Sequence, residues 1–144
     1  MKRLTILTVA ALTLVSSLMA ASVSADETKK PPKDRVVVMY FHRTQRCPTC
    51  QKMGSYTEEA IKTGFAKQLK DRTVELHFIN FEDEKNAAFA KAYKVTGPAL
   101  IEARVADGKV AEFKNLADIW KHAGDKTVFV KYVQDEVKAY LAKK

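Results

Sequence analysis

The sequence predicts one α/β domain with the element order β-α-β-α-β-β-α, in which helices flank a central mixed sheet. A short apolar run, Val36 to Phe41, is rich in β-branched and aromatic residues, which is typical of a strand buried on both faces. Apolar residues at helical spacing follow it and precede a second strand-like segment, giving a β-α-β order. Near the end of the chain, Asp107-Gly108 separates two further strand-like segments, and this dipeptide is a strong hairpin signal.

The first half of the domain contains two strands and the helical segment between them. After the strand at 36–41, helical spacing extends from about Pro48 to Lys70 and predicts one long helix or two consecutive helices. Gly54 and Gly64 weaken this helix and mark possible kinks. The alternating segment Val74 to Phe81 then predicts the second strand.

The second half begins with a helix and ends with one. Asp83 is placed to cap a helix over Glu84 to Tyr93, an alanine-rich segment. The hairpin signal predicts antiparallel strands at Ala99 to Ala106 and Val110 to Phe113. Apolar residues at three- and four-residue intervals from Val128 to Leu141 predict a terminal amphipathic helix.

The N-terminus has the features of a secretory leader. Lys2 and Arg3 precede an apolar run from Leu4 to Ala21, and small residues follow it as far as Ala25. An uncleaved membrane anchor is the alternative, because the run is nearly long enough to cross a bilayer core of about 30 Å. We expect residues 1–25 to be a cleaved signal peptide, 26–34 a flexible polar tether and 35–144 the folded domain, exported to the periplasm or secreted.

The chain is basic, with a net charge of +8. A charge of this sign favours acidic protein surfaces or anionic lipid headgroups as partners. The lysines are spread along the chain without interleaved aromatic residues, so the sequence indicates no nucleic-acid binding.

The chain has two cysteines, and both lie in the motif Cys47-Pro48-Thr49-Cys50. As a structural staple, so short a loop would contribute only about 2 kcal/mol, less than a longer loop. A Cys-x-x-Cys motif beside a β-α-β pattern is instead a strong signal for a redox-active pair. The motif lies where the first strand gives way to the first helix.

This junction predicts different roles for the two thiols. Cys47 would lie just before the first helical turn, where free N–H groups and the helix dipole stabilise a thiolate, and Pro48 suits the first helical position. Cys50, inside the helix, would be more buried. We therefore expect Cys47 to be the nucleophile and Cys50 the resolving thiol.

Nearby charged and exposed residues are candidates for tuning the pair. We expect Arg43, Arg46, Pro48 and Thr49 to tune the pKa of Cys47 or to contact a partner, and Lys52 extends the basic collar. Simple solvent-exposed charges are an equally weighted alternative for the arginines.

Metal binding is a further alternative for the two thiolates. A closed zinc site needs four ligands, and the remaining ones would have to come from His42, His77 or His122, whose spacing matches no zinc signature. We therefore expect no metal and no other cofactor.

Four segments together resemble the thioredoxin-like superfamily over nearly all of the predicted domain: the first strand, the Cys-Pro-Thr-Cys turn, the strand ending in Ile79-Asn-Phe81, and Tyr93-Lys-Val-Thr-Gly-Pro98. Within it, the stretch from Tyr40-Phe-His42 to Tyr56-Thr-Glu-Glu-Ala60 is similar to the nitrophenyl compound nitroreductase subunit family of exported proteins.

The resemblance also shows where the chain departs from ordinary thioredoxins. Arg46 stands where thioredoxins carry Trp, and Met39 stands about where they bury an acidic residue that assists proton transfer, which would make Cys50 a slower resolving thiol. The loop Gly97, Pro98, Ala99 is the candidate cis-proline loop. Either Pro98 is cis after a one-residue deletion, or the site lacks a cis-proline.

The sequence thus predicts an exported thiol-disulfide oxidoreductase or electron-transfer protein. Its partners would be protein thiols or disulfides, including a membrane thiol reductant or oxidant. The alternatives are a thiolate metal-binding module and a redox-silent thioredoxin-fold subunit of another enzyme.

Overall fold

The structure, a computed structural model, describes residues 30–143. The signal peptide expected at 1–25 and the first residues of the expected tether therefore lie outside the described part. The described elements, in chain order, are β1 (Arg35–His42), α1 (Pro48–Gly64), α2 (Ala66–Asp71), β2 (Val74–Asn80), the 3-10 helix η1 (Glu84–Asn86), α3 (Ala87–Ala92), β3 (Ala99–Ala106), β4 (Lys109–Asn115), α4 (Ile119–His122) and α5 (Lys126–Leu141).

The four strands form one mixed sheet in the order β2-β1-β3-β4. Strand β1 pairs with β2 in parallel and with β3 antiparallel, and β4 pairs with β3 antiparallel. Tyr40 of β1 therefore lies between Phe78 of β2 and Leu100 of β3. The central position of β1 explains its unbroken apolar run, since a strand covered on both faces has no solvent side. The predicted α/β order and mixed sheet are confirmed.

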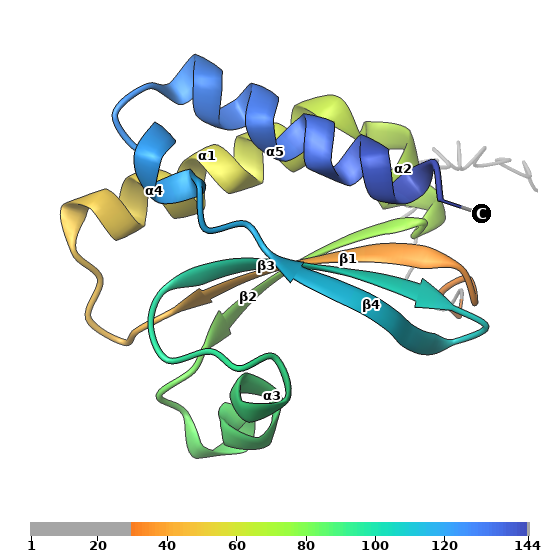
Figure 1. Cartoon of the computed structure of the whole chain (residues 1–144), viewed down its shortest axis with the longest axis horizontal. Helices are drawn as coiled ribbons and strands as arrows, with labels where there is room; N and C mark the ends of the chain where they lie inside the picture. The colour runs from red at the N-terminus through yellow and green to blue at the C-terminus, as the bar shows by residue number, and fades with distance from the viewer. Residues whose placement is uncertain (1–29, 144) are drawn as a thin grey trace, which may run out of the picture.

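Helices cover the two faces of the sheet unequally (Figure 1). Helices α1, α2, α4 and α5 lie on one side, and the short α3 lies on the other. The larger core cluster lies under the first group and includes Val38, Tyr40, Met53 and Phe129, all fully buried. The smaller cluster, with Met39, Phe41 and Ile101, lies on the α3 side. The alternation of side chains along β1 supplies both clusters.

The hairpin between β3 and β4 has the predicted turn. Asp107 and Gly108 have φ values of 52° and 79°, and a two-residue turn of this kind requires positive φ at both positions. The turn also holds the chain that enters β1, because Gly108 N donates to the carbonyl of Lys33 and Asp107 N donates to the carboxylate of Asp34. The last two residues of the expected tether are thus hydrogen-bonded to the domain.

The helical predictions are confirmed with two corrections. The segment 48–70 forms two consecutive helices, one of the two expected forms, with the break after Gly64. The helix expected over 84–93 is a 3-10 turn followed by α3, and Asp83 makes no side-chain cap there because its carboxylate accepts from Asn80 Nδ2 at 3.3 Å. Helix α4 was not predicted. Within residues 30–143, no helix combines the length and the hydropathy needed to cross a bilayer.

Candidate redox-active site

Cys47 is the N-cap residue of α1. Its backbone is extended, with φ −70° and ψ 158°, and its sulfur accepts a hydrogen bond from Cys50 N at 3.2 Å. Pro48 occupies the first turn, and no acidic residue lies there to oppose negative charge. A thiolate at Cys47 would meet the free N–H groups and the positive end of a 17-residue helix. The expected position of Cys47 is confirmed.

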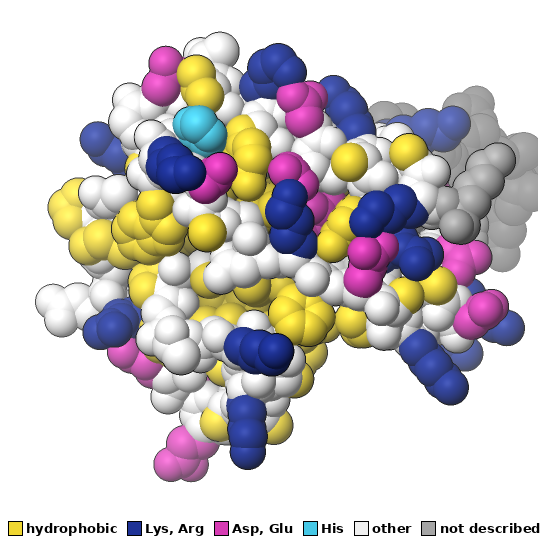
Figure 2. Space-filling view, in the orientation of Figure 1, with side chains coloured by type: hydrophobic (Ala, Val, Ile, Leu, Met, Phe, Trp, Pro, Cys, Tyr) yellow, Lys and Arg dark blue, Asp and Glu magenta, His cyan; other side chains and the backbone are white. Residues whose placement is uncertain are grey.

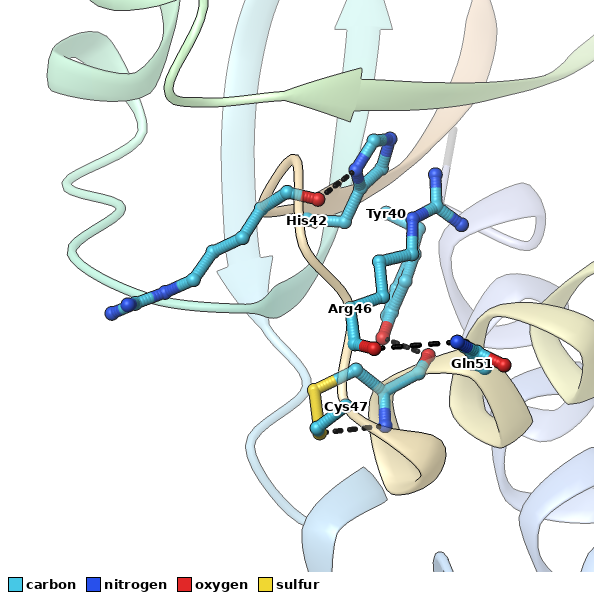
Figure 3. Close-up of a disulfide and its surroundings, with 7 residues drawn as sticks. Tyr40, His42, Arg46, Cys47 and Gln51 are labelled. Carbon is cyan, nitrogen blue, oxygen red and sulfur yellow. Dashed lines mark hydrogen bonds between the residues drawn. A yellow bond between two sulfur atoms is a disulfide. The ribbon is translucent and has the colours of Figure 1, made fainter.

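The two cysteines are joined by a disulfide and differ in exposure. Their Cα atoms are 5.1 Å apart. Cys47 is exposed, whereas Cys50 is buried, with 7% of its surface exposed. Cys47 is therefore the more accessible of the two sulfurs, and the nucleophilic and resolving roles expected for the pair stay a prediction. Figure 3 shows the pair at the start of α1. Thr49 and Pro48 are exposed on the same turn.

Tyr40 is a member of this site that the sequence analysis missed. Its hydroxyl donates to the carbonyl of Cys50 at 2.7 Å, and its side chain is fully buried (Figure 3). Burial raises the pKa of Tyr40 to about 12, and the positive charge of Arg46 acts in the opposite direction. A buried tyrosine needs a hydrogen-bond partner for its hydroxyl. The presence of Tyr40 in the predicted buried strand was therefore the one sequence feature that could have indicated such a contact.

The arginines do not form a collar against the sulfur atoms. Arg46 extends alongside Tyr40 and away from the disulfide (Figure 3), while its carbonyl accepts from Gln51 Nε2 at 3.2 Å. The Arg43 guanidinium lies over the ring of Phe81, 5.9 Å from its centroid. The charge of Arg46 thus acts on Tyr40, whose hydroxyl contacts Cys50. Arg43 is directed toward the ring of Phe81 instead of the sulfur atoms.

The loop before Cys47 is tied to the end of β2. Thr44 N donates to the Glu82 carboxylate at 2.9 Å, and Asn80 Nδ2 donates to the Thr44 hydroxyl at 2.8 Å. Phe81 N also donates to the carbonyl of His42 at 3.0 Å. These bonds join the segment that follows β1 to the segment that ends β2, so the loop holds Cys47 at the carboxyl ends of the two parallel strands.

The three histidines are distributed among different contacts. His42 Nδ1 lies 2.9 Å from the carbonyl of Arg43, and His77 Nε2 lies 3.1 Å from a Glu75 oxygen. His122 packs against Tyr132 at a ring-centroid distance of 5.2 Å. Within the described range 30–143, no group of three or more His, Cys, Asp or Glu side chains lies together in a way that could hold a metal ion.

The segment Gly97 to Ala99 leads into β3. No cis peptide bond occurs among residues 30–143, so the cis alternative for Pro98 is wrong for this structure. Ala99 is the first residue of β3 and pairs with Phe41, next to the strand end from which the cysteine loop departs.

Among residues 30–143, the buried acidic side chain is Glu102 on β3, and position 39 carries a buried methionine. Met39 is fully buried in the α3-side cluster, as its apolar character requires. Glu102, opposite Val38, is also fully buried, and neither carboxylate oxygen has a hydrogen-bond partner. Burial, reinforced by the negative charge of Glu136, raises the pKa of Glu102 to about 8. The sequence predicts this strand with Glu102 in it, but the pattern does not indicate that the glutamate is buried.

Several solved protein structures are similar to this chain. A mutant thioredoxin from Halobacterium salinarum is 23% identical, with 74% of this chain and 75% of that chain covered and a TM-score of 0.43. Fasciola hepatica thioredoxin is 23% identical over 67% of this chain and 83% of its own, with a TM-score of 0.42. A malarial protein is 17% identical over 67% and 94%, with a TM-score of 0.41.

No protein-family model matches the chain, and no curated protein matches it. The TM-scores are below 0.5, so the fold class rests on the observed strand order, strand directions and helix placement. With β1 and β2 parallel, β3 and β4 antiparallel, and a cysteine pair at the start of the helix after β1, the chain has a thioredoxin-like α/β fold.

Proposed function

We propose that this chain is an exported thiol-disulfide oxidoreductase or electron-transfer protein that cycles the Cys47–Cys50 pair between dithiol and disulfide. The observation that carries the proposal is the combination of an exposed N-cap cysteine with a buried partner one turn later. The N-cap position lowers the pKa expected of a thiol, and the Cys50 N–H already points at the Cys47 sulfur.

The reaction transfers two electrons by two exchanges. The Cys47 thiolate attacks one sulfur of a partner disulfide, the partner S–S bond breaks, and the first partner thiolate leaves and takes up a proton. Cys50 then loses its proton to water and attacks Cys47 Sγ, which releases the second partner thiolate and forms the Cys47–Cys50 disulfide. The chain is oxidised and the partner is reduced. The reverse sequence oxidises a partner dithiol.

Protein thiols and disulfides are the proposed substrates. Hydrophobic side chains gather at the end of the molecule where α1 begins and α4 lies (Figure 2), and Trp120 of α4 is 46% exposed. On the same face, the basic side chains are interspersed with acidic ones. An apolar protein segment beside the disulfide fits this surface better than a polyanion does.

Export and the finer family resemblance remain proposals supported by sequence alone. The leader at residues 1–25 supports a periplasmic or secreted location, with a membrane thiol reductant or oxidant as redox partner. N-terminal sequencing of protein from the exported fraction tests this, with Asp26 as the expected first residue. The likeness to the nitrophenyl compound nitroreductase subunit family rests on the motif stretch around the cysteines.

The direct test of the chemistry uses the two cysteines as matched controls. Wild type, Cys47→Ser and Cys50→Ser are compared for insulin reduction with dithiothreitol as the electron source. We expect Cys47→Ser to lose the activity and Cys50→Ser to accumulate a mixed disulfide with insulin. Equal activity of wild type and Cys47→Ser would overturn the assignment of the nucleophile.

A further inference from the structure

Tyr40 connects the central strand to the first turn of the cysteine helix. Its hydroxyl donates to the carbonyl of Cys50 at 2.7 Å, and this hydrogen bond is buried. That carbonyl belongs to the first helical turn, so its position is coupled to that of both cysteines. The bond therefore fixes the height and rotation of the turn relative to the sheet.

The ring of Tyr40 is held in place by close packing. A Cβ atom at Gly54 would lie 3.1 Å from Tyr40 Cε1 and 3.6 Å from Phe78 Cε1, so the glycine allows α1 to approach the sheet closely. Phe78 packs edge-on against Tyr40 with ring centroids 5.9 Å apart. Glycine weakens a helix interior, and this close approach is the physical reason for one at position 54.

Cys50 carries a hydrogen bond at each end of its backbone. Its N–H donates to Cys47 Sγ at 3.2 Å, and its carbonyl accepts from Tyr40. In the oxidised protein the disulfide also holds the two residues together. In the dithiol form that covalent link is gone, so the hydrogen bond from Tyr40 contributes more to keeping the Cys50 N–H aimed at the Cys47 sulfur.

We propose that Tyr40 is a positioning residue for the cysteine pair: by holding the Cys50 carbonyl it stabilises the reduced form relative to the disulfide and keeps Cys47 reactive. The inference rests on the proposed redox function. The hydroxyl dipole acts in the same direction, because its hydrogen, the positive end, points into the turn that carries the thiolate.

The test compares Tyr40→Phe with Tyr140→Phe, using the protein purified from the exported fraction. Both changes remove one hydroxyl from a buried tyrosine of the same core cluster, and Tyr140 lies at the end of α5, next to the start of β1 rather than its cysteine end. The measured quantity is the equilibrium constant for reduction of the protein disulfide by two glutathione molecules, which yields the dithiol and oxidised glutathione. The second quantity is the rate of Cys47 alkylation by iodoacetamide at pH 7.

We expect Tyr40→Phe to lower the equilibrium constant about fivefold and to slow alkylation by a similar factor, as suits one neutral hydrogen bond. For this two-electron couple, a fivefold change corresponds to about 20 mV. Tyr140→Phe should leave both quantities unchanged. Gly54→Ala, which pushes on the Tyr40 ring and improves the helix, should shift both in the same direction by a smaller factor, and it replaces Tyr40→Phe if that variant does not fold.

Three results would overturn the inference. The first is an unchanged equilibrium constant in Tyr40→Phe, even if the melting temperature falls. That result would show that the Tyr40 hydroxyl stabilises the fold without affecting the redox equilibrium of the cysteine pair. The second is an equal shift in Tyr140→Phe. The third is a wild-type disulfide that does not titrate against glutathione at all, which would instead refute the proposed function on which this inference rests.

Discussion

Replacing Glu102 by glutamine should stabilise the protein at alkaline pH and leave it nearly unchanged at pH 4. Glu102 is fully buried on β3 beneath α5, and both carboxylate oxygens lack hydrogen-bond partners. Burial raises its pKa to about 8, the charge of Glu136 adds to this, and Lys114 and Lys143 oppose it. The folded protein therefore keeps a neutral carboxylic acid in its core at neutral pH.

The sign and size of the effect follow from proton linkage. The unfolded chain loses this proton near pH 4.5, whereas the folded chain holds it until about pH 8. Because the pKa is raised in the folded state, the contribution of Glu102 to the free energy of unfolding is fully present below pH 4.5. It is lost progressively as the pH rises from 4.5 through 8. At about 1.4 kcal/mol per pKa unit, the full loss is about 5 kcal/mol. This is comparable to the whole stability of many domains.

The assay is urea unfolding of the oxidised protein at intervals from pH 4 to pH 9. The advantage of Glu102→Gln over wild type should grow from near zero at pH 4 to several kcal/mol at pH 9. Glu102→Met should show the same trend with added stability throughout, because it buries no polar group. Parallel curves for wild type and Glu102→Gln would refute the reasoning and would mean that water or a partner satisfies the carboxylate.

Three further predictions concern the site and the hairpin. In reduced protein, mass mapping should find iodoacetamide on Cys47 well before Cys50, with an inflection below pH 8.5; faster labelling of Cys50 would reverse the assigned roles. Arg46→Ala should slow the alkylation of Cys47 by less than about threefold, because the guanidinium is directed along Tyr40. A tenfold or larger fall in the rate would instead support the expectation that Arg46 tunes the pKa of Cys47. Gly108→Ala should cost about 1 kcal/mol in urea unfolding, since Gly108 has φ 79°, and an unchanged midpoint would contradict the turn assignment.

The elements with a strong local pattern were predictable from the sequence. The buried run in β1 needed only its composition, and Asp107-Gly108 determined the hairpin because few dipeptides tolerate two positive φ values. The position of Cys47 at the start of α1 followed from Pro48, which favours a first helical turn.

Features that depend on tertiary contacts were not predictable. Asp83 has the side chain of a helix cap, yet Asn80 engages it. Helix α4 is four residues long, too short to show a helical period. Glu102 shares its face of β3 with Arg104, so alternation predicts an exposed position. Only the packing of α5 on that side of the sheet reveals that Glu102 is buried.

The site shows the same division. The Cys-x-x-Cys motif identified the cysteine pair. Tyr40 lies ten positions before Cys50, and its hydrogen bond to Cys50 depends on the close packing of α1 against β1, to which Gly54 contributes. The directions of Arg43 and Arg46 depend on the rings of Phe81 and Tyr40, which the sequence does not place beside them.

A redox titration of the Cys47–Cys50 pair against glutathione, read by mass mapping of alkylated thiols, tests the central claim most directly. The account predicts a reversible two-electron transition between dithiol and disulfide, with a midpoint between about −120 and −270 mV, the range of thiol-disulfide exchange proteins. A pair that stays oxidised, with a midpoint below about −300 mV as in structural disulfides, would contradict it.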